Sequence, residues 1–249
     1  MSRNPPQCLP FVFEVGSTDP STQTVFWLHG GTFSHQEFTP VLTDLFKDKY
    51  RHILLDLPGH GALALEDFNL EKGMKNLEFA IRRYASNERK CHIVGCSLGG
   101  VTALTLLRHK PEFIGNYVSR ILASSPRLEV PPFATLVLVI AVLLVRTFVL
   151  LYSIQATKAY VEKKLGLKLS EALVNDMRKW ASLGRILRAS QNTPGPELFV
   201  DNIREGVDVS LMLCVSSKES IERLLDVENK LKRKVRSCKS VVVLDQMHL

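Results

Sequence analysis

The sequence predicts an α/β protein built on an open, mostly parallel sheet that is flanked by helices. Three observations indicate this class. Short apolar runs that end at turn residues alternate along the chain with longer segments of helical periodicity. The runs are hydrophobic at successive positions, which is typical of strands buried on both faces of a parallel sheet. The composition, with 45% hydrophobic and 23% charged residues, is that of a globular chain.

Seven runs qualify as strands because each is short, apolar and bounded by turn residues. They cover residues 11–15, 25–28, 52–55, 91–94, 118–123, 210–215 and 241–244. The helices expected between them cover roughly residues 36–47, 70–86, 98–109 and 219–235. Residues 127–206 break the alternation, because they contain helical and irregular sequence but no convincing strand. We therefore predict a core of residues 1–126 and 207–249 and a helical cap insertion of residues 127–206.

Charge and cysteine content exclude several classes of function. The chain has 32 Lys and Arg against 25 Asp and Glu, a formal net charge of +7 that is too mild and too scattered to indicate nucleic acid binding. The five cysteines form no CxxC pair, which disfavours a disulfide framework or a zinc ribbon and favours a reducing compartment. The first ten residues lack the apolar stretch of a secretory signal. We expect a cytoplasmic protein.

The segment GCSLGG at residues 95–100 carries the main chemical signal. A Gly-x-Ser-x-Gly pattern is common by itself, but here it follows an expected strand and opens an expected helix. On so sharp a turn Ser97 would hold a strained backbone, and Gly95 and Gly99 would keep neighbouring atoms clear of it. The hydroxyl would project above the sheet at a helix N-terminus, where the dipole favours developing negative charge. The pattern predicts a nucleophile, with a glycine-rich turn of no chemistry as the alternative.

A second signal lies upstream, where His29, Gly30 and Gly31 end an expected strand. Glycine lets the backbone come close to a ligand. The backbone N–H groups of Gly31 and Leu98 could therefore both point at an oxygen bound near the serine, as in an oxyanion hole. A plain tight turn is the alternative. The turn at residues 56–61 is interpreted as purely structural.

Together these residues resemble the α/β-hydrolase fold superfamily, in its serine esterase and lipase branch. The resemblance depends on HGG at 29–31, DLPGHG at 56–61, GCSLGG at 95–100 and the rhythm of strands and helices around them. It covers residues 11–125 well and 208–248 less well. It implies a catalytic triad in the chain order nucleophile, acid, histidine, and neither a metal nor an organic cofactor.

In that order the resemblance assigns the general base to His248, which follows the last expected strand. A surface histidine is the alternative. Glu219 falls on the acid position, although it could equally be a first-turn glutamate of the helix that begins there. Asp245 and Asp226 are weaker candidates for the acid.

Two features depart from the family pattern. The chain ends one residue after His248, where the family usually continues with a helix that braces the histidine loop, and the acid turn lacks its usual glycine. A base on a frayed terminus would be poorly held. We expect either a shortened chain or an impaired triad.

The cap insertion contains an apolar stretch, residues 133–154, interrupted only by Arg146. As a helix it would measure about 33 Å, close to a bilayer core. A single crossing would nevertheless separate two strands of one sheet, and Arg146 would be costly in the membrane. We favour a cap helix that covers the mouth of the site and lines an acyl pocket or dips into a membrane surface. A helix buried against the sheet and, more remotely, a membrane anchor are the alternatives.

The basic residues near the C-terminus have two interpretations, a solvated helix face or contact with anionic lipid headgroups. They are Lys230, Lys232, Arg233, Lys234, Arg236 and Lys239.

These observations predict a serine hydrolase that cleaves a carboxylic ester or thioester of an apolar, lipid-like acyl group through an acyl-enzyme. Ser97 attacks the carbonyl, His248 transfers the proton and Glu219 orients the imidazole. The expected partners are a small-molecule ester or lipid substrate and a peripheral membrane surface, without nucleic acid. The alternative is a catalytically impaired member of the fold that binds a lipid or protein partner through its cap.

Overall fold

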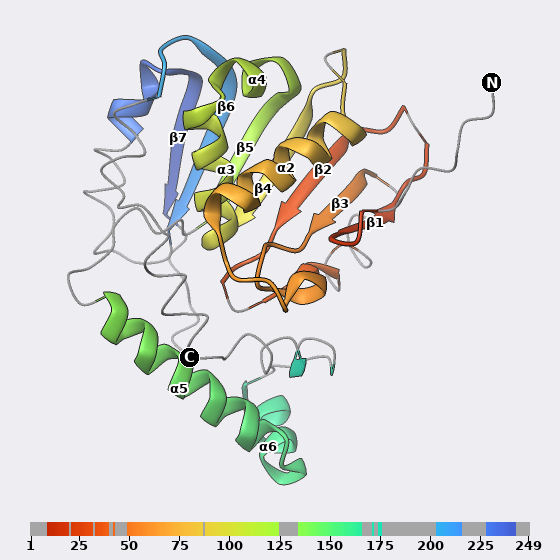
Figure 1. The fold of residues 1–249 in the computed structure, drawn as a ribbon, viewed down its shortest axis with the longest axis vertical. Helices are drawn as coiled ribbons and strands as arrows, with labels where there is room; N and C mark the ends of the chain where they lie inside the picture. The colour runs from red at the N-terminus through yellow and green to blue at the C-terminus, as the bar shows by residue number, and fades with distance from the viewer. Residues whose placement is uncertain are drawn as a thin grey trace.

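A single seven-stranded sheet forms the centre of the protein (Figure 1). The structure, a computed structural model, describes residues 9–19, 21–31, 33–39, 42, 49–86, 88–124, 134–165, 171, 174–175, 203–215 and 228–242. The strands are β1 (Val12–Gly16), β2 (Thr24–Leu28), β3 (Arg51–Leu55), β4 (Cys91–Cys96), β5 (Val118–Ser124), β6 (Val207–Val215) and β7 (Val235–Val242). Their order is β1-β3-β2-β4-β5-β6-β7, with β1 antiparallel and the other pairs parallel. The predicted open, mostly parallel sheet is confirmed.

Three helices cover one face of this sheet, as Figure 1 shows. They are α2 (Leu70–Tyr84), α3 (Leu98–His109) and α4 (Pro111–Tyr117). Helix α2 begins at Asn69, whose side chain accepts the N–H of Lys72 at 2.9 Å. Its buried residues recur every three or four positions, so one side of the helix faces the sheet.

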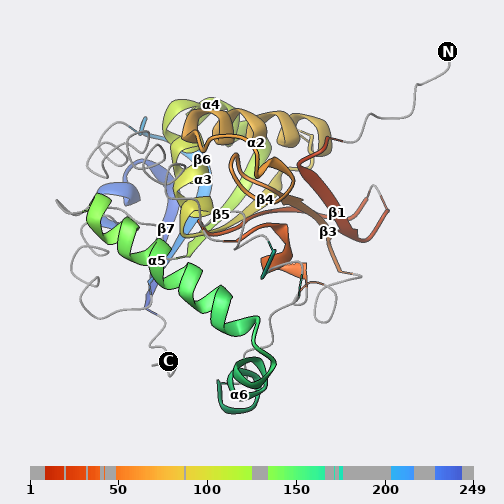
Figure 2. The same ribbon diagram turned by 60° about the horizontal axis from the view of Figure 1, so that its bottom comes forward.

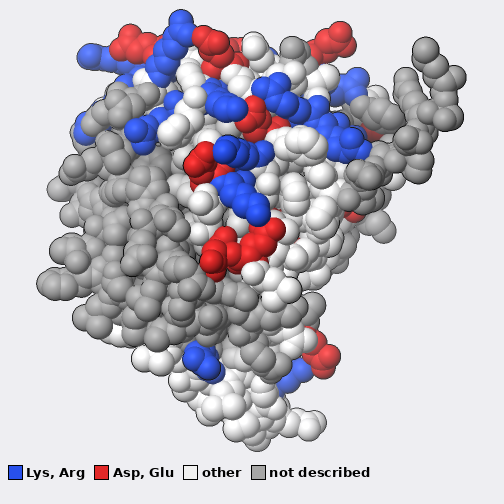
Figure 3. All heavy atoms as spheres, viewed as in Figure 1, with Lys and Arg blue, Asp and Glu red and all other residues white. Residues whose placement is uncertain are grey.

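The main hydrophobic core lies between these helices and the sheet. Fully buried side chains such as Phe26, Ile53 and Ile93 point from the strands toward Leu77 and Leu106 on the helices. The outer side of the helices carries charges of both signs (Figure 3), including ion pairs between the carboxylate of Glu78 and two cations of the same surface. The three helices thus bury this face of the sheet and expose their own charged outer side to solvent.

Two elements differ from the predictions. Helix α4 was not predicted. It begins at Pro111 and has only seven residues, which are too few to show a helical period of apolar residues. Strand β7 begins at Val235 rather than at residue 241. It is the last strand in the sheet order and carries exposed Arg236 and Lys239, so its sequence does not form an apolar run.

The predicted basic cluster has partners within the described residues. Lys232 pairs with Glu228 at 2.8 Å and Arg236 with Asp208 at 3.0 Å, and the ammonium group of Lys234 donates to a backbone carbonyl. Of the two interpretations, these contacts favour a solvated, ion-paired surface.

Helices α5 (Ala134–Tyr152) and α6 (Gln155–Leu165) lie beyond the carboxyl ends of the strands (Figure 2). Val149 and Tyr152 of α5, Val161 of α6 and Val174 form a second apolar cluster, against which Phe33 of the loop after β2 packs. Within the described part of the chain, no helix has the length and hydropathy for a membrane crossing. The cap boundaries at 127–206 stay a prediction, since many of those residues lie outside the described ones.

Candidate active site

Ser97 occupies the sharp turn between β4 and α3. Its φ is +45° and its ψ −106°, and it is the one non-glycine residue with positive φ in the described ranges. Residues other than glycine rarely adopt this backbone conformation, because it costs free energy. It persists here because the surrounding structure imposes it. The Ser97 N–H donates to the carbonyl of Ser124 in the neighbouring β5 at 2.7 Å. The predicted strained backbone is confirmed.

The glycines two positions before and after Ser97 are required by close packing. A Cβ at Gly95 would lie 2.5 Å from the nitrogen of Gly100, and a Cβ at Gly99 would lie 2.2 Å from the carbonyl oxygen of Leu28. Both distances are too short for any side chain. The turn is therefore pressed against its own helix and against the end of β2.

The glycine loop after β2 lies beside this turn. A Cβ added at Gly30 would lie 3.9 Å from the Cβ of Ser97, and one at Gly31 would lie 3.8 Å from Cδ2 of Leu98. The structure thus brings together the residues predicted for the oxyanion hole. Within the described residues, neither the Gly31 N–H nor the Leu98 N–H donates a hydrogen bond. Two backbone donors are therefore available next to the serine.

His29 supports this loop from a fully buried position. Its Nε2 accepts the Leu57 N–H at 3.0 Å, so the ring proton resides on Nδ1, which donates to the carbonyl of Gly30 at 2.7 Å. Burial lowers the pKa of His29 from 6.5 to about 3, and the nearby imidazole of His60 adds to this effect. His29 is therefore a neutral structural group at physiological pH.

Both free N–H donors belong to peptides whose carbonyl side is anchored. The Gly31 N–H shares its peptide with the Gly30 carbonyl, which accepts the imidazole proton described above. The Leu98 N–H shares its peptide with the Ser97 carbonyl, which accepts the Val101 N–H at 3.0 Å. Because a peptide unit is planar, fixing its oxygen also fixes the direction of its N–H. A hydrogen bond at the oxygen also polarises the N–H.

Glu37, which the sequence patterns did not single out, lies behind the loop. Its Oε2 accepts the Gly30 N–H at 2.8 Å and its carboxylate accepts the thiol of Cys96, the residue before Ser97. Burial raises the pKa of Glu37 and raises that of Cys96 to about 12, to which the neighbouring carboxylate contributes. Glu37 therefore connects the glycine loop to the serine turn. No sequence pattern marks such a role, because its partners lie in two separate segments.

The turn at residues 56–61 is built around the buried carboxylate of Asp56. It accepts the backbone N–H of His35 at 2.7 Å, the His35 imidazole at 3.0 Å and the Ala62 N–H at 2.8 Å. Burial alone would raise the pKa of Asp56, but the hydrogen bond and charge of His35 and the proximity of His29 hold it below its usual value. Gly61, at φ +48°, leaves room for this carboxylate, since a Cβ there would lie 2.1 Å from Oδ2.

The other predicted triad members fall outside the described residues. They are His248, Glu219 and the weaker acid candidates Asp226 and Asp245. Their distances to Ser97 are therefore untested, and their roles stay predictions. Among the described residues, no cluster of three or more His, Cys, Asp or Glu side chains could hold a metal ion.

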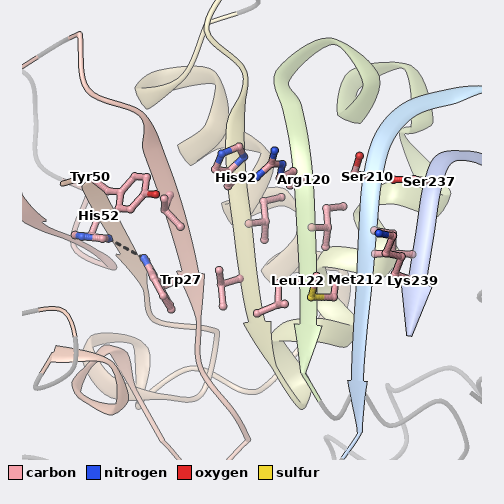
Figure 4. A pocket seen from close by; sticks show the side chains of 15 residues that line it. Trp27, Tyr50, His52, His92, Arg120, Leu122, Ser210, Met212, Ser237 and Lys239 are labelled. Carbon is pink, nitrogen blue, oxygen red and sulfur yellow. Dashed lines mark hydrogen bonds between the residues drawn. The ribbon is translucent and has the colours of Figure 1, made fainter. Parts of the chain in front are cut away.

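A pocket of about 420 Å³ lies elsewhere, along the middle of the strands (Figure 4). Trp27, His92, Leu122 and Met212 line it from four different strands, and Trp27 donates to Nδ1 of His52 at 3.1 Å. Ligands of open α/β sheets bind outside the carboxyl ends of the strands. We therefore place the candidate site at the serine turn and not in this pocket.

Comparisons with known proteins agree with this architecture. The sequence model of the alpha/beta hydrolase family matches residues 25–248. Over 99 residues the chain is 27% identical to an AB hydrolase superfamily protein of Gibberella zeae, a match that spans 39% of this chain and 35% of that relative.

Solved structures show the same fold. MenH from S. aureus is 16% identical, with coverage of 94% of this chain and 90% of that one and a TM-score of 0.57. The enol-lactonase from Burkholderia xenovorans LB400 is 12% identical, with coverage of 94% and 87% and a TM-score of 0.62. A carboxylesterase structure from Nitrososphaera gargenis is 17% identical, with coverage of 93% and 85% and a TM-score of 0.60. At these identities the likeness shows the fold alone.

Proposed function

Because the chain belongs to the alpha/beta hydrolase family, we propose that it is a serine hydrolase that cleaves a carboxylic ester or thioester of an apolar acyl group. The observation that carries this proposal is the strained Ser97 turn beside two backbone N–H groups with anchored carbonyls. Such preorganised donors stabilise the oxyanion of a tetrahedral intermediate without reorganising during the reaction.

The proposed reaction has two halves. Ser97 Oγ attacks the carbonyl carbon while His248 accepts its proton, and the N–H groups of Gly31 and Leu98 hold the oxyanion. Collapse of the intermediate breaks the bond to the leaving group, which takes the proton from His248. Water then gives a proton to His248 and attacks the acyl-enzyme. Collapse of this second intermediate breaks the bond to Ser97 Oγ, which takes the proton back from His248, and releases the carboxylic acid. Glu219 orients the imidazole throughout.

The apolar surroundings of the site support an apolar acyl group. Phe33 lies two residues after Gly31 and, like Val145 and Phe148 of α5, packs against the apolar cluster of Val149, Tyr152, Val161 and Val174. Apolar side chains therefore lie next to the position of the reacting carbonyl. An ester or thioester is supported further by the names of the related structures, which include a carboxylesterase and an enol-lactonase.

Labelling with a fluorophosphonate probe tests the nucleophile. We expect wild-type protein to be labelled, Ser97→Ala to lose the label, and Ser210→Ala in the middle of β6 to keep it. Thermal melting of the same samples establishes that each variant is folded. Folded wild-type protein that takes no label would contradict the proposal and favour the alternative, an impaired member that binds a lipid or protein partner.

Hydrolysis of p-nitrophenyl esters tests the acid. Loss of the carboxylate that orients the histidine lowers kcat by about 10⁴-fold in a serine triad. We expect Glu219→Gln to show a loss of this order and Asp226→Asn and Asp245→Asn to show none. A large loss in one of the aspartate variants instead would move the acid to that residue.

A further inference from the structure

The outward side of α5 carries exposed apolar side chains that extend to Ile154, two residues beyond the helix, with exposed Thr147 among them. Their exposed fractions are 48% for Ile140, 54% for Leu143, 65% for Leu144, 69% for Leu150, 45% for Leu151 and 51% for Ile154. Residues spaced by three or four positions share one side of a helix. These six residues, here called the α5 stripe, therefore form one surface rather than scattered contacts with solvent.

The opposite side of α5 is already occupied. Val149 and Tyr152 are buried, and Val145, Phe148 and Phe33 pack against the cluster that they form with Val161 and Val174. A helix that is apolar all round normally has apolar surroundings on every side. Exposed apolar patches of this kind mark interaction sites. The α5 stripe therefore has no apolar partner among the described residues and is available to contact another apolar surface.

The charges of α5 and α6 indicate which surrounding fits the stripe. Residues 134–165 contain four cations and one carboxylate. Arg146 belongs to α5 and exposed Lys163 and Lys164 to α6, whereas Lys158 lies over the ring of Tyr152 and Glu162 accepts the Tyr152 hydroxyl. Figure 3 shows the described atoms at this end of the molecule as mostly uncharged surface, with basic and acidic side chains at its margin. Two identical stripes facing each other would bring like charges together, whereas an anionic surface complements them.

We propose that the α5 stripe docks the protein on an anionic lipid surface. The helix lies in the plane of the interface, with its aliphatic side chains in the acyl region and with Arg146 and the α6 residues Lys163 and Lys164 at the headgroups. Since Phe33 packs against the cluster that the inner side of this helix helps to form, docking brings the candidate site next to the lipid. The proposal goes beyond the proposed chemistry, because binding is measured without turnover.

Cosedimentation with vesicles of phosphatidylcholine, with and without phosphatidylserine, tests the docking. We expect full-length protein to bind the anionic vesicles. Leu150→Glu removes one exposed leucine and is expected to weaken binding about tenfold, as expected for the loss of one inserted aliphatic side chain. Phe79→Glu is the matched control, because Phe79 is a 53% exposed apolar residue on α2 and receives the same charge. It should leave binding unchanged.

Two further variants separate the contributions. Lys163→Gln and Lys164→Gln should each weaken binding to anionic vesicles about fivefold, with no effect on neutral vesicles. Leu144→Trp should show a blue-shifted emission on vesicles relative to buffer, and Phe79→Trp should not, a readout that adds no charge to the stripe.

Three results would overturn the docking proposal. One is absence of vesicle binding by folded wild-type protein. Another is equal loss in Leu150→Glu and Phe79→Glu. The third is a wild-type dimer in light scattering that Leu150→Glu converts to a monomer, which would make the stripe an interface between two copies.

Discussion

Replacing His29 with phenylalanine should change how the stability of this protein depends on pH. In the folded state burial holds the pKa of His29 near 3, below its usual 6.5. As the pH falls, the unfolded chain therefore takes up this proton first. The contribution of the neutral imidazole to the free energy of unfolding is fully present above about pH 6.5 and is lost progressively as the pH falls to about 3.

The size of the effect follows from these pKa values. When the pH is lowered from about 6.5 to about 4.5, protonation of His29 in the unfolded chain should reduce the free energy of unfolding by about 2 kcal/mol. In His29→Phe this loss disappears. The variant also leaves the buried Leu57 N–H without its acceptor, so it should start about 1–3 kcal/mol less stable near neutral pH. The two stability curves should therefore converge as the pH falls.

Urea unfolding followed by circular dichroism over this pH range measures both effects. His60 and His92, whose pKa values are also lowered by burial, remain in both proteins, so the difference between the curves reports His29 together with its interactions with His60 and Asp56. Leu106→Ala is a control, because it destabilises the core of α3 by about 2–5 kcal/mol without removing a titrating group. Parallel curves for wild type and His29→Phe would refute the reasoning.

Other substitutions address the surroundings of the serine turn. Gly61→Ala should lower stability by several kcal/mol in urea unfolding, about 3 or more, because its Cβ meets the Asp56 carboxylate at a positive φ. Glu37→Gln should lower kcat about tenfold with little change in KM, since a neutral amide holds the Gly30 N–H less firmly; an unchanged kcat would remove Glu37 from the site. The thiol of Cys96, with a pKa raised to about 12, should resist iodoacetamide at about pH 8 until the protein is unfolded, as mass spectrometry would show.

Local backbone rules made much of the fold and of the serine turn predictable. Strands 25–28, 52–55 and 91–94 appear within a residue or two of their predicted bounds, and helix 98–109 appears with both ends as predicted. The three strands lie inside the sheet and the helix packs on it, so their sequences are mostly apolar and are bounded by turn residues.

The elements that were missed lack that signal. Strand β7 lies at the edge of the sheet, where exposed Arg236 and Ser237 separate buried Val235 from buried Cys238 and the sequence forms no apolar run. Helix α4 is too short to show a period. Glu37 reaches partners in two other segments, and no spacing in a single sequence reveals such a contact. The predicted residues His248 and Glu219 lie outside the described part of the chain.

The turn at residues 56–61, although structural, affects the candidate site indirectly, through hydrogen bonds between the loops after β2 and β3. Its Leu57 N–H sets the tautomer of His29, which in turn orients the peptide that carries the Gly31 N–H. His60, at the other end of the turn, lies with Nε2 2.7 Å from the Gly31 carbonyl. The donor peptide is thus held by His29 and the peptide that follows it by His60, and Asp56 holds the turn that positions both imidazoles. Substitutions at Asp56 should therefore reduce kcat as well as stability, because the direction of the Gly31 N–H, one of the two oxyanion donors, depends on this turn.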